Sequence, residues 1–153
     1  MADSTENGRA LGSLIFETLR LAGRLTLSGD ALMKDIGLTS ARWQIIGVIT
    51  FLPSPRTVSD LARTMGLSRQ AVQRIVNDLH SEGIVCLLPN PAHKRAPLVA
   101  LTEKGTQLHE EAELRRIPWT EDLVSGLDGY DLKATSSALS ALRHRLEKMQ
   151  SET

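Results

Sequence analysis

The chain has 153 residues, of which 41% are hydrophobic and 24% charged, and its formal net charge is +0. This length suits one core of ordinary domain size with an added oligomerisation layer, and the single cysteine, Cys86, excludes an intrachain disulfide framework. No apolar run is long enough to cross a bilayer and the first residues lack an export signal, so we expect a cytoplasmic protein with no membrane partner.

The N-terminal third of the chain predicts two helices separated by a break. Apolar or small residues recur at helical spacing over 11–25, which predicts a long first helix. Two glycines and an aspartate within 29–37 then favour a helix end or a loop. Thr39 or Ser40 can cap a second helix that runs through Phe51. This second helix is apolar nearly all round, which indicates burial on several sides.

The middle of the chain has the pattern of two short helices joined by a glycine turn. Thr57 and Asp60 are spaced as a capping box for the first helix, and Gly66 suits the left-handed turn that ends it. Ser68 can cap the second helix, which Gly83 would end. The inner faces carry the apolar residues Val58, Leu61, Ala62, Met65, Val72, Ile75, Val76 and Leu79. This pattern is typical of a helix-turn-helix.

The outer face of the second of these helices is left to polar and basic side chains, namely Arg69, Gln70, Gln73, Arg74 and Asn77. Glutamine amides suit adenine, and arginines suit guanine or phosphate. The alternative interpretation is an ordinary solvated helix face. The local charge favours DNA, because the range 56–104 has seven basic and four acidic residues, whereas 105–153 has six basic and nine acidic ones.

A predicted β-hairpin follows the second helix. Residues 84–88 and 98–101 are compact apolar runs typical of strands, and prolines flank the basic tip that lies between them. Lys94 and Arg95 in this tip form either a solvated loop or a stiff basic probe that suits a narrow minor groove. Arg56, just before the first helix, is a further candidate for phosphate contact.

The C-terminal part predicts two more helices. Thr102 can cap a helix that extends to about Gly126, and Pro118 should kink or interrupt it. Asp128 can cap the final helix. The first and last helices of the chain each carry an apolar stripe, which favours a twofold-symmetric homodimer built from both. The alternative is that these helices pack on the body of one monomer.

These elements resemble the MarR family of winged-helix transcriptional regulators. The resemblance runs from about Leu11 to Met149 and is carried by LARTMGLSRQAVQRIVNDLHSEGIV and by the wing and helix start NPAHKRAPLVALTEKG. It implies a mainly α fold with a small β-hairpin wing, that is, a winged helix-turn-helix with terminal dimerisation helices. The implied domains are an N-terminal dimerisation helix at 1–36, a DNA-binding domain at 37–104 and C-terminal dimerisation helices at 105–153.

The resemblance also implies which residues face double-stranded DNA. Positions in the second helix match the family's recognition helix, and Arg95 matches the wing arginine that commonly enters the minor groove. Asn90 and His93 stand where the family usually has aspartates, the second of which often braces the wing. The DNA-binding candidates are Ser68, Arg69, Gln70, Gln73, Arg74, Asn77, Lys94, Arg95 and Arg56.

Many members of the family respond to a small aromatic or phenolic effector bound near the junction of the second and fifth helices. Trp43 and Trp119 are therefore candidates for an effector pocket, with core packing as the alternative. A redox role for Cys86 is less favoured, because its neighbours predict a strand with a half-buried thiol. The four histidines form no tight multi-ligand cluster, so we expect no metal and no cofactor.

The sequence therefore predicts a homodimeric DNA-binding repressor that reads a palindromic operator and is released by a small aromatic effector. The alternative is a winged helix used for protein contact without sequence-specific DNA binding, which would favour an apolar or acidic outer face on the second helix. No catalytic carboxylate pair, phosphate-binding glycine loop or nucleophile elbow is present in the sequence. We therefore expect no enzyme activity.

Overall fold

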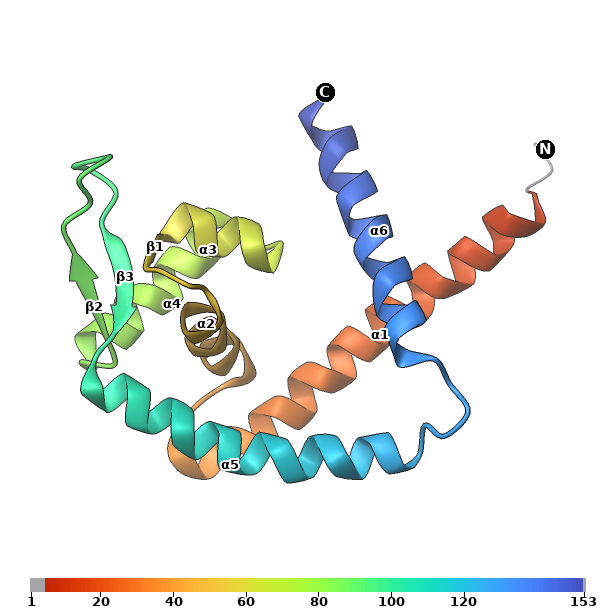
Figure 1. Ribbon diagram of the computed structural model, residues 1–153, viewed down its shortest axis with the longest axis horizontal. Helices are drawn as coiled ribbons and strands as arrows, with labels where there is room; N and C mark the ends of the chain where they lie inside the picture. The colour runs from red at the N-terminus through yellow and green to blue at the C-terminus, as the bar shows by residue number, and fades with distance from the viewer. Residues whose placement is uncertain (1–4, 153) are drawn as a thin grey trace. The chain divides into compact units, whose positions relative to one another are not determined.

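The computed structural model describes residues 5–152, so the first four residues of the predicted segment 1–36 and the last residue of 105–153 lie outside the described residues. The elements in chain order are α1 (Glu6–Met33), the 3-10 helix η1 (Lys34–Ile36), α2 (Ser40–Phe51), β1 (Arg56–Thr57), α3 (Val58–Met65), α4 (Arg69–Ser81), β2 (Val85–Leu88), β3 (Leu98–Leu101), α5 (Glu103–Ser125) and α6 (Leu132–Ser151) (Figure 1). The fold is mainly helical with a small sheet, which confirms the predicted class. None of the helices in the described range is both long and apolar enough to cross a membrane.

The chain divides into two compact units, and the boundary along the sequence falls between Ile117 and Pro118. The first unit contains α1 to β3 and the larger part of α5. The second contains the end of α5 and all of α6. The finer division into one DNA-binding and two dimerisation segments stays a prediction.

Helix α1 is longer than predicted because two expected breakers serve tertiary contacts instead. The helix ends between Asp30 and Gly37, as expected, but Gly29 and Asp30 are themselves helical. A Cβ at Gly29 would lie 2.8 Å from the Ser40 Oγ, so glycine lets α1 approach α2 closely. The Asp30 carboxylate accepts a hydrogen bond of 2.6 Å from the backbone N–H of Ser40. The chain finally turns at Gly37, where φ is 71°.

The predicted caps of the next three helices are confirmed. The Thr39 hydroxyl accepts from the Arg42 N–H at the start of α2. Thr57 and Asp60 form both hydrogen bonds of a capping box at α3, and Ser68 caps α4. The burial expected for α2 is only partly found, since Phe51 is 85% exposed.

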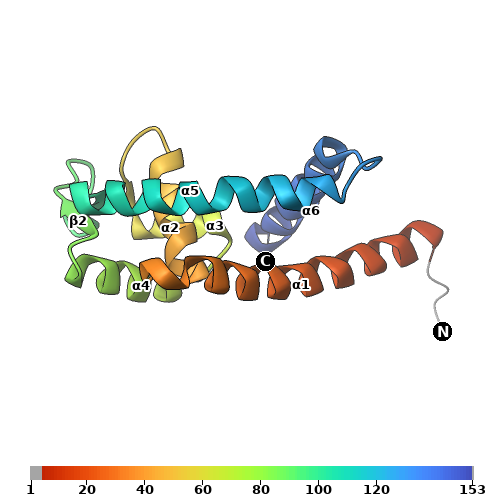
Figure 2. The same cartoon turned by 90° about the horizontal axis from the view of Figure 1, so that it is seen from below.

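The core of the first unit lies where α2 meets α1, α3, α4 and β3. In the view of Figure 2, α2 and α3 lie between α5 and α4. The largest fully buried hydrophobic side chains come from several elements: Met33, Ile45, Ile46, Leu61, Val72, Val76, Leu79, Val85 and Val99. The inner stripes predicted for α3 and α4 thus supply much of this core, and burying them holds the outer face of α4 toward solvent.

The sheet has three strands in the order β1-β3-β2, whereas the sequence predicted only a two-stranded hairpin. Strands β2 and β3 pair antiparallel with Val85 opposite Leu101 and Leu88 opposite Leu98. The missed strand β1 is only two residues long and pairs Arg56 with Val99. Such a short strand exists only because β3 presents a free edge, so local sequence does not reveal it.

Two C-terminal predictions need correction. Helix α5 is not interrupted at Pro118, while a kink there stays a prediction. Proline lacks the N–H that would bond the carbonyl of Leu114, a residue that is 74% exposed. The final helix is capped by Asp131 and not by Asp128. Gly129 adopts a φ of 92° that turns the chain before Asp131, whose carboxylate accepts from the Ala134 N–H at 2.9 Å.

Candidate nucleic-acid interface

The outer face of α4 is exposed along its length. Five side chains line one open hollow on this face: Arg69, Gln70, Gln73, Arg74 and Asn77. All are exposed except Gln73, which is half-buried and donates a hydrogen bond of 2.9 Å to the Asn77 Oδ1. Their amide and guanidinium groups supply the donors and acceptors that can read base edges.

The interior side of α4 holds this face in place. Val72, Val76 and Leu79 are 0% exposed, and the helix starts at the exposed Ser68, whose hydroxyl accepts from the Ala71 N–H. The C-terminal turn is closed by hydrogen bonds from the Gly83 and Ile84 N–H groups to carbonyls of α4. The helix is thus anchored at both ends and along its inner stripe.

The loop between β2 and β3, residues 89–97, is named the wing loop here, and Asn90 holds it closed. The Asn90 Nδ2 donates to the Ala96 carbonyl at 2.7 Å, and its Oδ1 accepts from the Ala92 N–H at 3.1 Å. Two turns follow, closed by the His93 and Ala96 N–H groups. From the sequence, Asn90 is notable only because the MarR family usually has aspartate there, and this closing role was missed. Asparagine between two prolines is nevertheless a local signal for such a turn.

The basic residues of the wing loop and of β1 are exposed. Lys94 and Arg95 are the central residues of the turn that the Ala96 N–H closes, inside the loop that Asn90 holds, and His93 is exposed beside them. Arg56 is exposed on β1 and lines a small hollow with Asp60 and Arg63. The predicted DNA-binding residues therefore fall into two groups, one on α4 and one on the wing loop and β1.

Asp60 is held as an anion at the start of α3. The hydrogen bond from the Thr57 hydroxyl, at 2.7 Å, holds the pKa of the Asp60 carboxyl below its usual range. Burial opposes this shift, while the Thr57 N–H and the nearby Arg63 and Arg56 add to it. Part of the positive charge next to α3 is therefore balanced locally, through the 3.3 Å Arg63–Asp60 pair.

A cavity of about 600 Å³ lies between α2, α3 and α5. Its lining residues are Trp43, Gln44, Gly47, Val48, Thr50, Phe51, Met65, His109, Glu113 and Arg116. Trp43 and Phe51 give it aromatic walls, which suit a planar ligand. Trp119, the other predicted pocket residue, belongs to the second compact unit and is not one of these lining residues, so its role stays a prediction.

The polar wall of the cavity comes from α5. Arg116 donates two hydrogen bonds to Glu113, at 2.7 and 2.6 Å, and these hold the pKa of the Glu113 carboxyl below its usual range despite burial. The His109 Nδ1 is buried and has no hydrogen-bond partner within the described part of the chain. A ligand with one hydroxyl or carbonyl group would satisfy this nitrogen.

Cys86 lies on β2 opposite Ala100 and is half-buried, as predicted. Within residues 5–152 no three histidine, cysteine or acidic side chains are placed to hold one metal ion. The site is therefore defined by the exposed polar and basic groups of α4, the wing loop and β1, and by the cavity.

Comparison of the sequence with known proteins finds a matching family model and related proteins. A family model described as MarR family matches residues 36–96. An uncharacterized protein of Mycobacterium tuberculosis is 36% identical over 129 residues, covering 84% of this chain and 89% of the relative. The transcriptional activatory protein BadR of Rhodopseudomonas palustris is 27% identical over 99 residues, covering 63% of this chain and 57% of that protein.

Solved structures share the fold. The transcriptional regulator BldR from Sulfolobus solfataricus aligns with a TM-score of 0.77 at 19% identity, covering 92% of this chain and 99% of that one. The M. tuberculosis regulator MosR, in complex with DNA, aligns with a TM-score of 0.74 at 21% identity, covering 88% and 96%. A MarR/EmrR family regulator from Acinetobacter sp. ADP1 aligns with a TM-score of 0.71 at 25% identity, covering 92% and 96%.

Proposed function

Because the chain belongs to the MarR family of winged-helix transcriptional regulators, we propose that it is a homodimeric repressor that reads a palindromic operator with α4 and the wing loop. The observation that carries this proposal is the exposed row of amide and guanidinium groups on α4. An α-helix of this kind fits the major groove, where each base pair presents a distinct pattern of donors and acceptors. The likeness to MosR, whose structure contains DNA, supports the same placement.

The two exposed groups have different roles in this proposal. Gln70 and Gln73 contact base edges, while Arg69 and Arg74 contact guanine or phosphate. Arg95 enters the minor groove and Lys94 pairs with phosphate, because both lie at the tip of the closed wing loop. Ser68, Asn77 and Arg56 complete the contact surface.

The apolar surface of α1 supports a dimer. Most of α1 is exposed, including seven large apolar side chains: Leu11, Ile15, Phe16, Leu19, Leu21, Leu25 and Leu27. So many exposed large apolar side chains on one helix of a folded monomer are typical of a subunit interface. Twofold pairing of these helices would present two copies of α4 to half-sites about one helical turn apart.

The cavity supports an effector site. A small aromatic ligand stacks on Trp43 and gives a hydroxyl or carbonyl group to His109. It releases DNA by binding better to a dimer whose recognition helices are mis-spaced for the operator. Repression follows from a dimer that covers its operator and blocks transcription, although the relative BadR is described as an activatory protein.

Selection of bound duplexes from a random library tests the core of the proposal. The expected result is a palindromic sequence bound by a dimer, with Arg74→Ala weakening it strongly. Sedimentation of the parent and of Ile15→Arg/Leu19→Arg tests the dimer, which the double variant should dissociate. No enriched sequence, or a parent that stays monomeric at every concentration, contradicts the proposal.

The effector is tested with Trp119→Phe, in which Trp43 is the remaining tryptophan. A library of small phenols and aromatic acids should contain members that quench its fluorescence and release the selected operator. Gly47→Leu, which fills the cavity, should abolish both effects while leaving operator binding intact. Quenching that survives Gly47→Leu would place the ligand elsewhere.

A further inference from the structure

The C-terminal end of α4 carries an acidic residue where a helix does not favour one. Glu82 is the C-cap of α4, and the aligned peptide dipoles give that end of a helix a partial negative charge. A carboxylate at this position is repelled by the helix it ends. Its presence therefore calls for an explanation outside α4.

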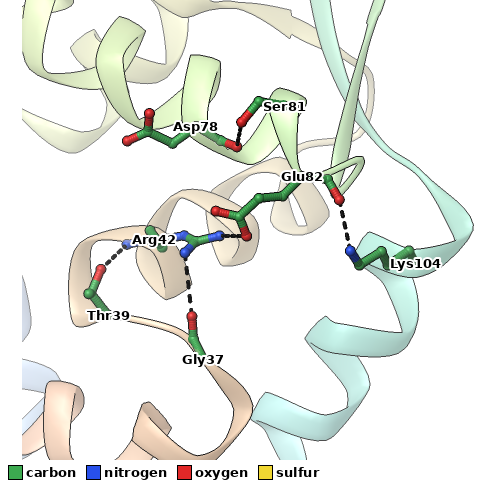
Figure 3. Close-up of polar contacts among 7 residues, drawn as sticks. All are labelled: Gly37, Thr39, Arg42, Asp78, Ser81, Glu82 and Lys104. Atoms are coloured by element: carbon green, nitrogen blue, oxygen red, sulfur yellow. Dashed lines mark hydrogen bonds and ion pairs between the residues drawn. The ribbon is translucent and has the colours of Figure 1, made fainter.

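Cations from two other elements meet at Glu82. The Arg42 Nη2 on α2 pairs with the Glu82 Oε2 at 2.5 Å, and the Arg42 Nη1 donates to the Gly37 carbonyl at 3.4 Å. The Lys104 Nζ on α5 donates to the backbone oxygen of Glu82 at 2.8 Å. Figure 3 shows both side chains reaching this end of α4 from opposite directions. The end of the recognition helix is thus tied to α2 and to α5.

The Arg42–Glu82 pair is better placed than an ordinary surface pair to fix a geometry. It joins residues forty positions apart on different helices, and the Arg42 side chain is only 19% exposed. Its Nε is buried and has no hydrogen-bond partner among the described residues, so losing Glu82 leaves this partly desolvated guanidinium with its bond to the Gly37 carbonyl alone. Exposed pairs within one helix contribute little by comparison.

The same turn of α2 is also fixed to α1. Ser40 is 1% exposed, and its N–H donates to the Asp30 carboxylate of α1 across the close approach at Gly29. One turn of α2 therefore touches α1 through Ser40 and α4 through Arg42. In the proposed dimer α1 lies at the subunit interface. The contacts from α1 to α2 and from α2 to α4 therefore set the position of α4 relative to the twofold axis.

We propose that the Arg42–Glu82 ion pair is a positioning contact that holds the C-terminal end of α4 against the first turn of α2, and so sets the orientation of the recognition helix for specific DNA binding. This inference rests on the proposed DNA binding by α4. Neither residue touches DNA in it. Trp43 follows Arg42 on the same turn and lines the cavity, so an effector there would act on the same contact.

Glu82→Gln separates two explanations, because the loss of charge alone and the loss of the positioning contact predict opposite changes in operator affinity. Removing a negative charge near a polyanion should tighten binding if long-range electrostatics alone matters. The positioning contact predicts that the variant binds the selected operator about three- to tenfold more weakly. Binding to an unrelated duplex should be unchanged or slightly tighter. A general loss of folding would weaken both, so the ratio of the two affinities is the readout.

Arg42→Gln should weaken operator binding similarly, and the double variant should be no weaker than the worse single variant. Arg115→Gln is the matched control. It breaks the 2.8 Å Arg115–Asp35 pair between α5 and η1, which joins different elements but does not involve α4. Operator affinity should stay within about twofold of the parent, the usual size of a surface change.

Hydrogen exchange tests positioning without DNA. The Glu82, Gly83 and Ile84 amides close the end of α4, and they should exchange faster in both Gln variants while α3 amides do not. If the parent selects no operator but these amides are affected, DNA binding fails and positioning stands. Unchanged exchange overturns the proposal, as does a Glu82→Gln protein that binds the selected operator as tightly as the parent.

Discussion

The backbone of Gly105 lies directly against the carbonyl of Ile84: a Cβ added at Gly105 would come 2.1 Å from that oxygen. The Ile84 carbonyl also accepts from the Thr102 N–H and hydroxyl at 3.1 Å. The start of α5 therefore packs against the backbone of Ile84, which lies between the end of α4 and the start of β2. This contact gives a physical reason for glycine at the end of the LTEKG segment.

Gly105→Ala should destabilise the protein by about 2 to 3 kcal/mol, because the added methyl group meets rigid backbone. Gly47→Ala is the matched control, since a Cβ there meets nothing within 4 Å inside α2. It should stabilise by about 0.5 to 1 kcal/mol by lowering the entropy of the unfolded chain. Urea unfolding at one fixed protein concentration measures both. A neutral Gly105→Ala would contradict the close contact.

The wing loop should depend on Asn90. Asn90→Ala removes both side-chain hydrogen bonds that close the loop. We expect a loss of about 0.5 to 1.5 kcal/mol in operator binding, with thermal stability nearly unchanged because the loop lies outside the core. Asn90→Asp keeps the acceptor for the Ala92 N–H and should lose less. Fluorescence anisotropy with labelled operator measures the effect, and equal affinities for all three proteins would refute it.

Base contacts and phosphate contacts should separate by their salt dependence. Gln73→Ala should weaken operator binding by about 1 to 3 kcal/mol and relax specificity at one base pair of each half-site. Lys94→Ala should weaken binding to every sequence and lower the slope of log affinity against log salt by about one. Titrations of operator and point-mutated operators across a salt series distinguish the two. The assignments are wrong if Gln73→Ala lowers all affinities equally.

Stability should fall in acid partly through Asp60. Its carboxyl has a pKa lowered from 3.8 in the folded protein, chiefly by the Thr57 hydroxyl. A lowered folded pKa contributes stability above the unfolded pKa, and that contribution is lost as the pH falls through the folded pKa. The stability difference between the parent and Asp60→Asn should therefore shrink below about pH 4. Urea midpoints from pH 6 to 3 measure it, and a constant difference would exclude the mechanism.

Local sequence determined the ends of most helices in the first unit. Thr39, Thr57, Ser68 and Thr102 cap the helices that follow them, since a hydroxyl satisfies backbone donors within three residues. Gly66 and Gly83 take the left-handed turns expected of them. The amphipathic period of α4 likewise decided which side chains face solvent, so the exposed Gln and Arg row was predictable.

Tertiary structure decided what depends on residues far apart in the sequence. Gly29 looks like a helix breaker until Ser40 packs against it. The change of the α6 cap from Asp128 to Asp131 is by contrast local, because the turn at Gly129 sets it. Strand β1 and the Arg42–Glu82 pair also have no local signal strong enough to identify them. Propensities and caps act over one helical turn, whereas these contacts join segments that only the folded chain brings within hydrogen-bond distance.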